Sequence, residues 1–311
     1  MNPLKFRPII SPKVWGYESW LISGYGNQVS VVDTGALADN DLNDLVEIYM
    51  DELVGEKVYN RFGTYFPLLI KIIHAQDDLS IQVHPNDREA EPMGELGKEE
   101  MWYVMDTTPD AKVVSGFTKD TSSEEVTQRL EDGSITDILH YTTVSPGDVV
   151  TIPAGRVHAL CKGTMVVEIQ ESSDLTYRLY DYQRPDKNGQ LRPLHIQEAL
   201  KVLTYGATKN PITHPDYTPD TAVPIADTEH FTVNLIRLTS PMVRDCSLLD
   251  SFVIYICTHG SAAICVTDAD DSTPIQIEKG EAVLVPASLD DVRLIPTSKE
   301  ACFIETFLGR N

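Results

Sequence analysis

The sequence predicts a mainly β protein made of two related β domains with a few short peripheral helices. Residues 79–84 alternate between apolar and polar side chains, which is typical of a half-buried strand. Residues 230–309 consist of short apolar runs separated by turn signals, as in β-sandwiches and barrels. Residues 146–158 and 279–291 share a Gly-acidic pair, four strand residues and Pro-Ala in the same register, which indicates two copies of one unit.

The alternating stretch predicts a polar face that several side chains share. The apolar residues at 79, 81 and 83 are expected on one side of the strand, and Ser80, Gln82 and His84 on the other. Pro85 ends the strand because it has no N–H to donate. One metal ion or substrate could therefore contact both Gln82 and His84, although a strand end with polar side chains facing water is the alternative.

Three segments predict helices. Asn40–Glu52 has one apolar stripe at helical spacing, with Gly55 expected at its end. Ser122–Glu131 is expected to be capped at its start and closed by Gly133, and a third helix is expected over His195–Leu203.

Residues 207–224 contain four prolines among Thr, Asn and Asp, which favours a linker. The expected domains are therefore 1–206, with strands and helical segments, and 225–311, which is almost entirely β. In the second copy of the repeat, Asp291 stands where the first copy has His158. If His158 does chemistry, the carboxyl-terminal copy has lost it.

Composition limits the classes of partner. The chain has 311 residues, an apolar fraction of 42% and a formal net charge of −22, which argues against nucleic-acid and anionic-membrane partners. An anionic substrate would then need local positive charge at its site. The five cysteines form no C-x-x-C pair, and neither an amino-terminal apolar region nor a run of about 18 apolar residues is present. A cytoplasmic protein with buried thiols is expected.

The spacing of Gly147, Pro153, Gly155 and His158 resembles the second sequence motif of the cupin superfamily. Cupins are small jelly-roll barrels that hold a metal inside, so the resemblance implies two cupin-like jelly-roll β-barrels, the second of them degenerate. The sequence departs from the motif at Lys162, where cupins often have Asn. It also has Gln-x-His at residues 82–84 where the first cupin motif has His-x-His.

Four motifs together resemble class I mannose-6-phosphate isomerase, in its short bacterial form. They are Leu-Ser-Ile-Gln-Val-His-Pro-Asn-Asp, Gly-Lys-Glu-Glu-Met-Trp, Pro-Ala-Gly-Arg-Val-His-Ala and Thr-Tyr-Arg-Leu-Tyr-Asp-Tyr, and the likeness spans residues from about 7 to 205. The resemblance implies an aldose–ketose isomerase that interconverts mannose 6-phosphate and fructose 6-phosphate through an enediol, with one Zn²⁺ per chain.

By motif position, the resemblance implies zinc ligands, a catalytic arginine and substrate-binding residues. His84, Glu100 and His158 fall on the ligands, and Glu100 is preferred to Glu99 because of its spacing from Trp102. Arg178 falls on the catalytic arginine, Lys98 on a lysine near the substrate, and Gln82 either on a fourth ligand or on a group beside the metal. A neutral amide oxygen is a weak zinc ligand, so Gln82 is expected to bind substrate beside the metal and not to be a ligand. The other histidines, at 74, 140, 195, 214, 230 and 259, match no ligand spacing.

The chemistry agrees with these residue types. Two imidazoles, one carboxylate and an open position make a catalytic zinc site. Moving a carbonyl from C1 to C2 requires removal of an α proton by a group that the sequence does not identify. Arg178 is permanently cationic and can hold charge developing on the enediolate. Lys98, Arg178 and Lys162 are the candidate cations for the phosphate.

Two other functions remain open at this point. One is a different cupin metalloenzyme, such as an iron dioxygenase, and the other is a non-catalytic, sugar-binding double cupin. A monomer or homodimer acting on a sugar phosphate, with no nucleic-acid or membrane partner, is expected.

Overall fold

The computed structural model describes residues 1–266 and 274–308, which are mainly β with short helices. The chain forms two compact units that interleave along the sequence. The central unit comprises Ile10–Ser19 and Lys71–His214, and the terminal unit comprises Met1–Ile9, Trp20–Ile70 and Pro215–Asn311. The predicted domain boundaries, at 206 and 225, stay a prediction. Each compact unit is built from several separate segments, so the units cannot be compared directly with boundaries along the chain.

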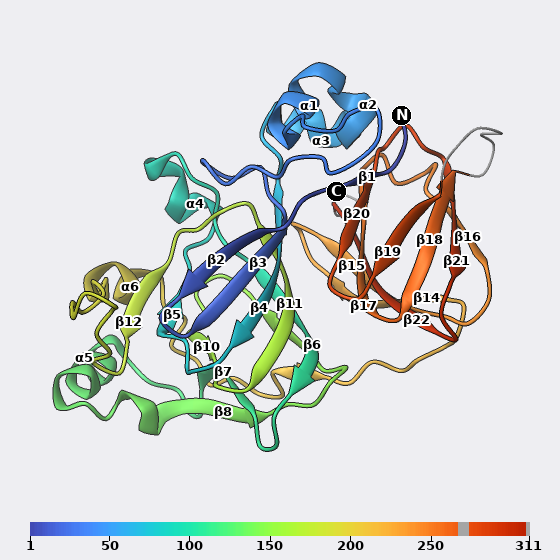
Figure 1. The fold of residues 1–311 in the computed structure, drawn as a ribbon. Helices are drawn as coiled ribbons and strands as arrows, with labels where there is room; N and C mark the ends of the chain where they lie inside the picture. The colour runs from blue at the N-terminus through green and yellow to red at the C-terminus, as the bar shows by residue number, and fades with distance from the viewer. Residues whose placement is uncertain (267–273, 309–311) are drawn as a thin grey trace. The chain divides into compact units, whose positions relative to one another are not determined.

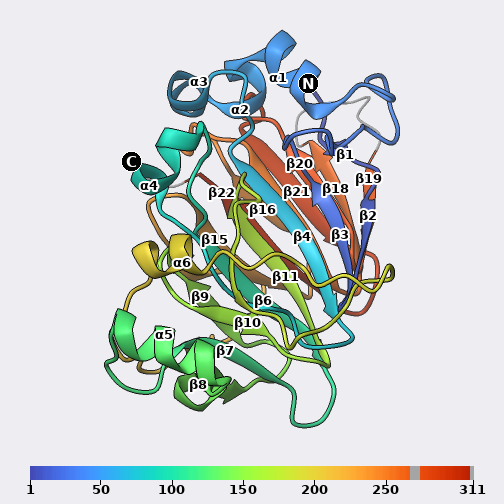
Figure 2. The ribbon, with the colours of Figure 1, turned by 90° about the vertical axis from the view of Figure 1, so that its left-hand side faces the viewer.

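The central unit is built on two antiparallel sheets (Figures 1 and 2). The five-stranded sheet has the order β12 (Tyr177–Tyr180), β5 (Ile81–Val83), β10 (His158–Leu160), β7 (Lys112–Phe117) and β8 (Leu139–Thr143). The seven-stranded sheet has the order β13 (Ile212–Thr213), β9 (Val149–Ile152), β6 (Glu100–Thr107), β11 (Thr164–Glu171), β4 (Leu68–Ala75), β3 (Gly16–Ile22) and β2 (Ile9–Lys13).

Short helices cover the outer face of the five-stranded sheet. They are α5 (Ser123–Asp132), η2 (Ile135–Ile138) and α6 (Ile196–Val202), and α5 and α6 lie beside β8 and β12 in Figure 1. Ser122 caps α5 and Gly133 ends it in the left-handed conformation, as predicted. Val126 and Ala199 of these helices pack in one apolar cluster with Ile81. The alternate residues of the same strands therefore face the interior between the sheets. The remaining helices of this unit are α4 (Asp87–Ala90) and η1 (Glu91–Met93).

Part of the interior between the two sheets is apolar. Residues of both sheets, among them Leu160, Trp102 and Val166, form a buried cluster that also contains Leu79. The expectation that Leu79 shares a face with Ile81 is therefore wrong. The strand begins only at Ile81, so the alternation does not extend back to residue 79.

The terminal unit also has two antiparallel sheets with an apolar cluster formed by residues of both. The six-stranded sheet has the order β1 (Leu4–Lys5), β20 (Ala282–Val285), β17 (Val253–His259), β22 (Ala301–Phe307), β15 (Thr232–Leu238) and β14 (Ala222–Asp227). The four-stranded sheet has the order β16 (Met242–Asp245), β21 (Asp291–Pro296), β18 (Ser261–Val266) and β19 (Ile275–Glu278). The description of the two units as jelly-roll barrels stays a prediction.

The sequence repeat corresponds to equivalent local structures in the two units. In the first copy Gly147 has φ 96° and precedes β9, and in the second Gly280 has φ 92° and precedes β20. Both strands have four residues, as the repeat predicted. A positive φ is readily adopted only by glycine, which explains why both copies keep it.

Two predictions about local structure need correction. The helix expected over Asn40–Glu52 is split into α1 (Leu42–Tyr49) and α2 (Asp51–Val54), because Met50 between them has φ 48°. A further helix, α3 (Glu56–Phe62), follows Gly55. Part of the expected linker forms strands β13 and β14. Pro224 is tolerated in β14 because that strand lies at the edge of its sheet.

Among the described residues, no helix has the length and apolar character to cross a membrane.

Candidate functional site

Neighbouring strands of the five-stranded sheet place four polar residues in one row. Arg178 of β12 is the cross-strand partner of Gln82, Gln82 is the partner of His158, and His158 is the partner of Ser115. Directly opposed residues of an antiparallel pair project to the same face. Since the other face of this sheet packs against helices, the row faces the interior. His84 follows Gln82 by two residues and is buried.

The seven-stranded sheet contributes acidic and amide side chains from two adjacent strands. Glu100 on β6 is the cross-strand partner of Gln170 on β11, and Trp102 is the partner of Glu168. All four residues are almost completely buried. Each pair shares a face with Val104 and Val166 of the interior apolar cluster, so polar residues of both sheets occupy one part of the same interior.

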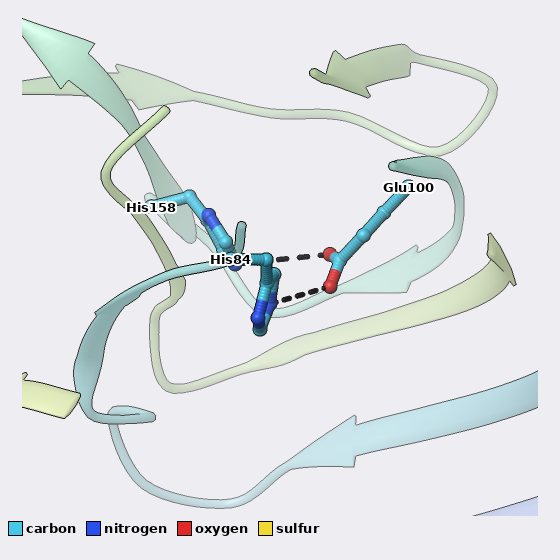
Figure 3. A group of neighbouring side chains, drawn as sticks. All are labelled: His84, Glu100 and His158. Atoms are coloured by element: carbon cyan, nitrogen blue, oxygen red, sulfur yellow. Dashed lines mark ion pairs between the residues drawn. The ribbon is translucent and has the colours of Figure 1, made fainter. Parts of the chain in front are cut away.

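Three of these side chains converge, as Figure 3 shows. The ligand atoms of His84, Glu100 and His158 all lie within 4.8 Å of one another. His84 Nε2 is 2.8 Å from Glu100 Oε1, and His158 Nε2 is 3.8 Å from Glu100 Oε2. The sequence therefore identified a set of residues that the fold brings together from three different strands or strand ends. Glu99, the rejected alternative, is not part of this group.

Backbone carbonyls fix the tautomer of both histidines. His84 Nδ1 lies 2.8 Å from the carbonyl oxygen of Leu175, and His158 Nδ1 lies 2.8 Å from that of Arg156. A carbonyl only accepts, so each Nδ1 must donate, and in a neutral ring the lone pair is then on Nε2. Both Nε2 atoms thus present lone pairs toward Glu100, as in metal-binding histidines held by a second hydrogen bond.

Electrostatics keep these groups in the forms that bind metals. Burial lowers the pKa of His84 to about 3, with the charge of Lys98 adding to the effect, and burial also lowers the pKa of His158. Burial alone would raise the pKa of Glu100, but the charges of Lys98, His84 and His158 bring it well below its usual value. Near neutral pH the group therefore consists of two neutral imidazoles and one carboxylate.

The group fits a divalent transition-metal ion. His84 Nε2 and both Glu100 oxygens are buried and have no hydrogen-bond partner of suitable geometry, although buried polar atoms normally have one. Lone pairs of His84 and Glu100 face each other at 2.8 Å, which is unfavourable unless a cation lies between them. Two nitrogens and one oxygen are a donor set that zinc accepts with a position left open, and other transition metals also accept it.

Lys98 lies beside this group. Its Nζ is 2.9 Å from Glu100 Oε1, and the side chain is almost completely buried. Burial would lower the pKa of Lys98, but the charges of Glu100, Glu168 and Asp174 raise it above its ordinary value. Lys98 is therefore a fixed positive charge at the site, not a solvated loop lysine.

A chain of polar contacts connects Arg178 to His158. Arg178 Nε donates to Ser80 Oγ at 3.2 Å, and Ser80 Oγ donates to Gln82 Oε1 at 3.3 Å. Gln82 Nε2 is 3.4 Å from His158 Nε2. Gln82 is thus held beside the metal-ligand candidates, where the motif placed it. Arg178 makes no ion pair with Asp181 among the described contacts, since Asp181 pairs with Arg184 and Arg192.

A cavity of about 220 Å³ lies beside this group, and its described lining does not include His84, Glu100 or His158 themselves. Gln82, Lys98 and Arg178 line it, and Lys162 is not among its described lining residues. The described lining includes five cations and three acids: Lys13, Lys71, Lys98, Arg178 and Arg192, with Glu18, Glu168 and Asp174. A chain of net charge −22 thus has a local excess of cationic groups where an anionic substrate would need it.

Sequence reasoning did not single out six of these charged lining residues: Lys13, Glu18, Lys71, Glu168, Asp174 and Arg192. Lys71 interrupts the apolar run Leu68–Ile73, and Glu168 interrupts the run Met165–Ile169, which are both signals because Lys and Glu are rarely buried without a partner. Neither Lys13 nor Arg192 interrupts a long apolar run, and nothing local marks them.

Glu168 combines burial with a carboxylate oxygen that makes no hydrogen bond. Its Oε2 accepts from Trp102 Nε1 at 2.9 Å, while Oε1 is 3.5 Å from Lys71 Nζ and makes no hydrogen bond. Burial, and then the negative charge of Glu100, raise the pKa of Glu168 to about 7 against the opposing charge of Lys71. A carboxyl group with that pKa can both take up and release a proton near neutral pH.

Comparisons with known proteins agree with one another. A family model described as the catalytic domain of type I phosphomannose isomerase matches residues 8–119, which include His84 and Glu100. The chain is 38% identical over 224 residues to a probable mannose-6-phosphate isomerase of Bacillus subtilis, covering 65% of this chain and 69% of that protein. It is 31% identical over 313 residues to a putative mannose-6-phosphate isomerase of the same organism, covering 93% and 95%. A crystal structure of the mannose 6-phosphate isomerase from Bacillus subtilis superimposes with a TM-score of 0.85 at 28% identity, covering 98% of this chain and 99% of that chain.

Proposed function

The chain belongs to the type I phosphomannose isomerase family, and we propose that it interconverts mannose 6-phosphate and fructose 6-phosphate. The observation that carries this proposal is the convergence of His84, Glu100 and His158 beside a cavity rich in cations. The reaction is an internal redox exchange in which C1 is reduced and C2 is oxidised, so no external oxidant or reductant is needed.

We infer that His84, Glu100 and His158 hold one Zn²⁺ per chain. The inference is supported by the Nε2 atom of His84 and both oxygens of Glu100, which make no hydrogen bond. His158 Nε2 lies near them and also faces Gln82 Nε2 at 3.4 Å. A bound Zn²⁺ would polarise the carbonyl of the open-chain sugar or hold its hydroxyls in place. Gln82 lies next to His158 and can orient the same end of the sugar through its amide.

Lys98 and Arg178 supply fixed positive charge in the lining of the cavity. Removing the C2 proton places negative charge on the sugar oxygens as the enediolate forms. Arg178 is held by Ser80 and by the Pro193 carbonyl oxygen, so it need not reorganise as that charge develops. We propose Arg178 as the catalytic arginine and Lys98 as a substrate-binding residue.

We propose Glu168 as the group that carries the proton. Its Oε1 would take the proton from C2, which leaves the enediolate, and then return it to C1, while the hydroxyl proton on O2 passes to O1 so that C2 becomes the ketone carbonyl. The C2–H bond breaks, a C1–H bond forms, and the carboxyl group ends in the state in which it began. Support comes from its place in the cavity lining, its unused oxygen and a pKa of about 7.

A coupled assay with mannose 6-phosphate tests the function. Fructose 6-phosphate formation is expected with protein as purified, loss of formation after chelation, and recovery on adding Zn²⁺. Family membership favours this reaction over the dioxygenase-like and sugar-binding alternatives. Activity that depends on iron and oxygen, or no turnover with any metal, would contradict the proposal.

We also propose that the enzyme works in the cytoplasm as a monomer or homodimer, without a nucleic-acid or membrane partner. All five cysteines are free and four of them are buried, which suits a reducing compartment. The strong negative charge disfavours polyanionic partners.

A further inference from the structure

Arg192 lies in a segment that no motif marked, yet its side chain lines the same cavity as Arg178. The segment runs along the free edge of the five-stranded sheet, since β12 is the edge strand. His195 N donates to the carbonyl oxygen of Arg178 at 2.8 Å, and Arg178 Nη1 donates to the Pro193 carbonyl oxygen at 2.8 Å. These contacts hold the segment, and Arg192 with it, next to Arg178.

Each of the two guanidinium groups is anchored on one side. Arg192 donates from Nε and Nη2 to the two oxygens of Asp181, at 2.7 and 2.5 Å. Arg178 donates from Nε to Ser80 and from Nη1 to Pro193. Nη1 of Arg192 and Nη2 of Arg178 take no part in these bonds, so each arginine keeps one –NH₂ group for a ligand. Fixed donors of this kind bind an anion with little loss of side-chain freedom.

The two like charges line one cavity, and the carboxylates of Asp181 and Asp174 offset part of their repulsion. Burial and then the positive charge of Arg192 lower the pKa of Arg178, and the charges of Asp181 and Asp174 oppose them. Asp181 neutralises part of the charge of Arg192 but is shared with Arg184. A dianion that contacts both free –NH₂ groups would relieve this repulsion.

Strand order places this pair at the end of the row away from the metal-ligand candidates. The row runs His158, Gln82, Arg178, and the segment carrying Arg192 comes next. On the facing sheet, Lys13 lies on β2, the edge strand of that sheet. Three strands, β11, β4 and β3, separate β2 from β6, which carries Glu100. Adjacent strands are about 4.8 Å apart, so Arg192 and Lys13 are several strand spacings from the metal end. A hexose 6-phosphate has its phosphate at the carbon opposite to C1 and C2.

We propose that Arg192 binds the phosphate group of the substrate, with Lys13 nearby and Arg178 between the phosphate and the metal end. This inference rests on the proposed function for the identity of the sugar and deepens it by assigning the group that selects phosphorylated substrates. It replaces Lys162, which the sequence suggested and which lies outside the cavity lining. Arg192 is a specificity-determining residue in this arrangement.

The chain offers a matched control. Arg184 also pairs with Asp181, at 2.9 Å, but is not among the residues that line the cavity. Arg192→Gln and Arg184→Gln therefore each remove one positive charge that pairs with Asp181. Only Arg192→Gln also removes a positive charge from the cavity lining. Arg192→Lys keeps the charge and loses the bidentate fork.

The test measures binding and turnover separately. Binding of 6-phosphogluconate, a phosphate ester that this reaction does not convert, is followed by calorimetry for the wild type and the three variants. Steady-state kinetics with mannose 6-phosphate gives KM and kcat. We expect Arg192→Gln to weaken binding and raise KM by roughly 10- to 100-fold, the loss of a charge-assisted hydrogen bond, with kcat changed only a few-fold. Arg184→Gln should stay within about two-fold of the wild type, and Arg192→Lys should fall in between.

Failure of this inference is distinguishable from failure of the proposed function. If the wild type isomerises mannose 6-phosphate and Arg192→Gln binds as the wild type does, the phosphate assignment is overturned and the function stands. If 6-phosphogluconate binding depends on Arg192 but no isomerisation occurs, the phosphate site stands and the function falls. Equal losses in Arg192→Gln and Arg184→Gln would show that both act through Asp181 and would overturn the assignment. Should Arg192→Gln not fold, Arg192→Lys takes its place, and binding equal to the wild type would then count against the role of the bidentate fork.

Discussion

Replacing Glu100 with glutamine removes the carboxylate that lies between Lys98 and the two histidines. Lys98 Nζ is 2.9 Å from Glu100 Oε1 and both side chains are almost completely buried. Two unit charges at that distance attract by about 6 kcal/mol at an effective dielectric constant of 20. Breaking one side of a buried pair usually costs about 3–5 kcal/mol, because the other charge is left without compensation. For a chain of 311 residues, with an unfolding entropy of about 0.65 kcal/mol/K, that loss lowers Tm by about 5–8 °C.

Lys98→Met breaks the same pair from the other side, and a metal ion separates the two variants. In the metal-free protein both should lose about 3–5 kcal/mol. In Lys98→Met the carboxylate and both imidazoles remain, so bound Zn²⁺ compensates the charge of Glu100 and restores stability. In Glu100→Gln the anionic ligand is gone, and added Zn²⁺ should restore little. Metal at a hundred times its Kd stabilises a binding-competent protein by about 2.7 kcal/mol.

Thermal unfolding with chelator and with added Zn²⁺ measures this difference. Lys162→Met serves as the control, because Lys162 is exposed and does not line the cavity. We expect Zn²⁺ to raise the Tm of Lys98→Met and the control by several degrees more than that of Glu100→Gln. Equal metal-induced shifts in Glu100→Gln and Lys98→Met would refute the reasoning, since Glu100 would then not be a ligand.

Three further predictions concern the catalytic groups and the fold. Arg178→Ala should keep its bound metal and lose about 100- to 1000-fold in kcat, as expected for one lost donor to a developing oxyanion, and an unchanged rate would make Arg178 structural. The wild-type kcat/KM should rise as the pH increases through about 7, because the raised pKa of Glu168 means that its basic carboxylate form is populated only above that value. Glu168→Gln should lose this rise in kcat/KM with pH. If both proteins show the same pH profile, Glu168 is not part of the mechanism. A chain cut after residue 225 should be insoluble, because β1 loses its partner β20, and a soluble, active fragment would contradict the domain interpretation.

The metal-ligand candidates were within reach of the sequence because their chemistry is local. Alternation puts Gln82 and the following His84 on one face, and Gly147, Pro153 and Gly155 mark the turn that precedes His158. The residue types then specify the kind of site without any knowledge of distances. The glycine-turn-strand repeat was equally predictable, because a positive φ leaves a glycine in both copies.

The rest of the site depends on packing that no local pattern encodes. Arg192 contributes to the cavity only because its segment lies along the edge strand β12, a pairing between distant residues. The pKa of Glu168 depends on burial and on Glu100, which comes from another strand. In the terminal unit, β1 pairs with β20 across almost the whole chain, so a boundary drawn along the sequence could not anticipate the compact units.

The central claim is that His84, Glu100 and His158 hold one catalytic metal ion. The most direct measurement is metal content by mass spectrometry, made on the same samples of wild type and His158→Ala as the mannose 6-phosphate assay. We predict one zinc per wild-type chain, and neither zinc nor turnover in His158→Ala. Full turnover by metal-free His158→Ala would contradict the claim.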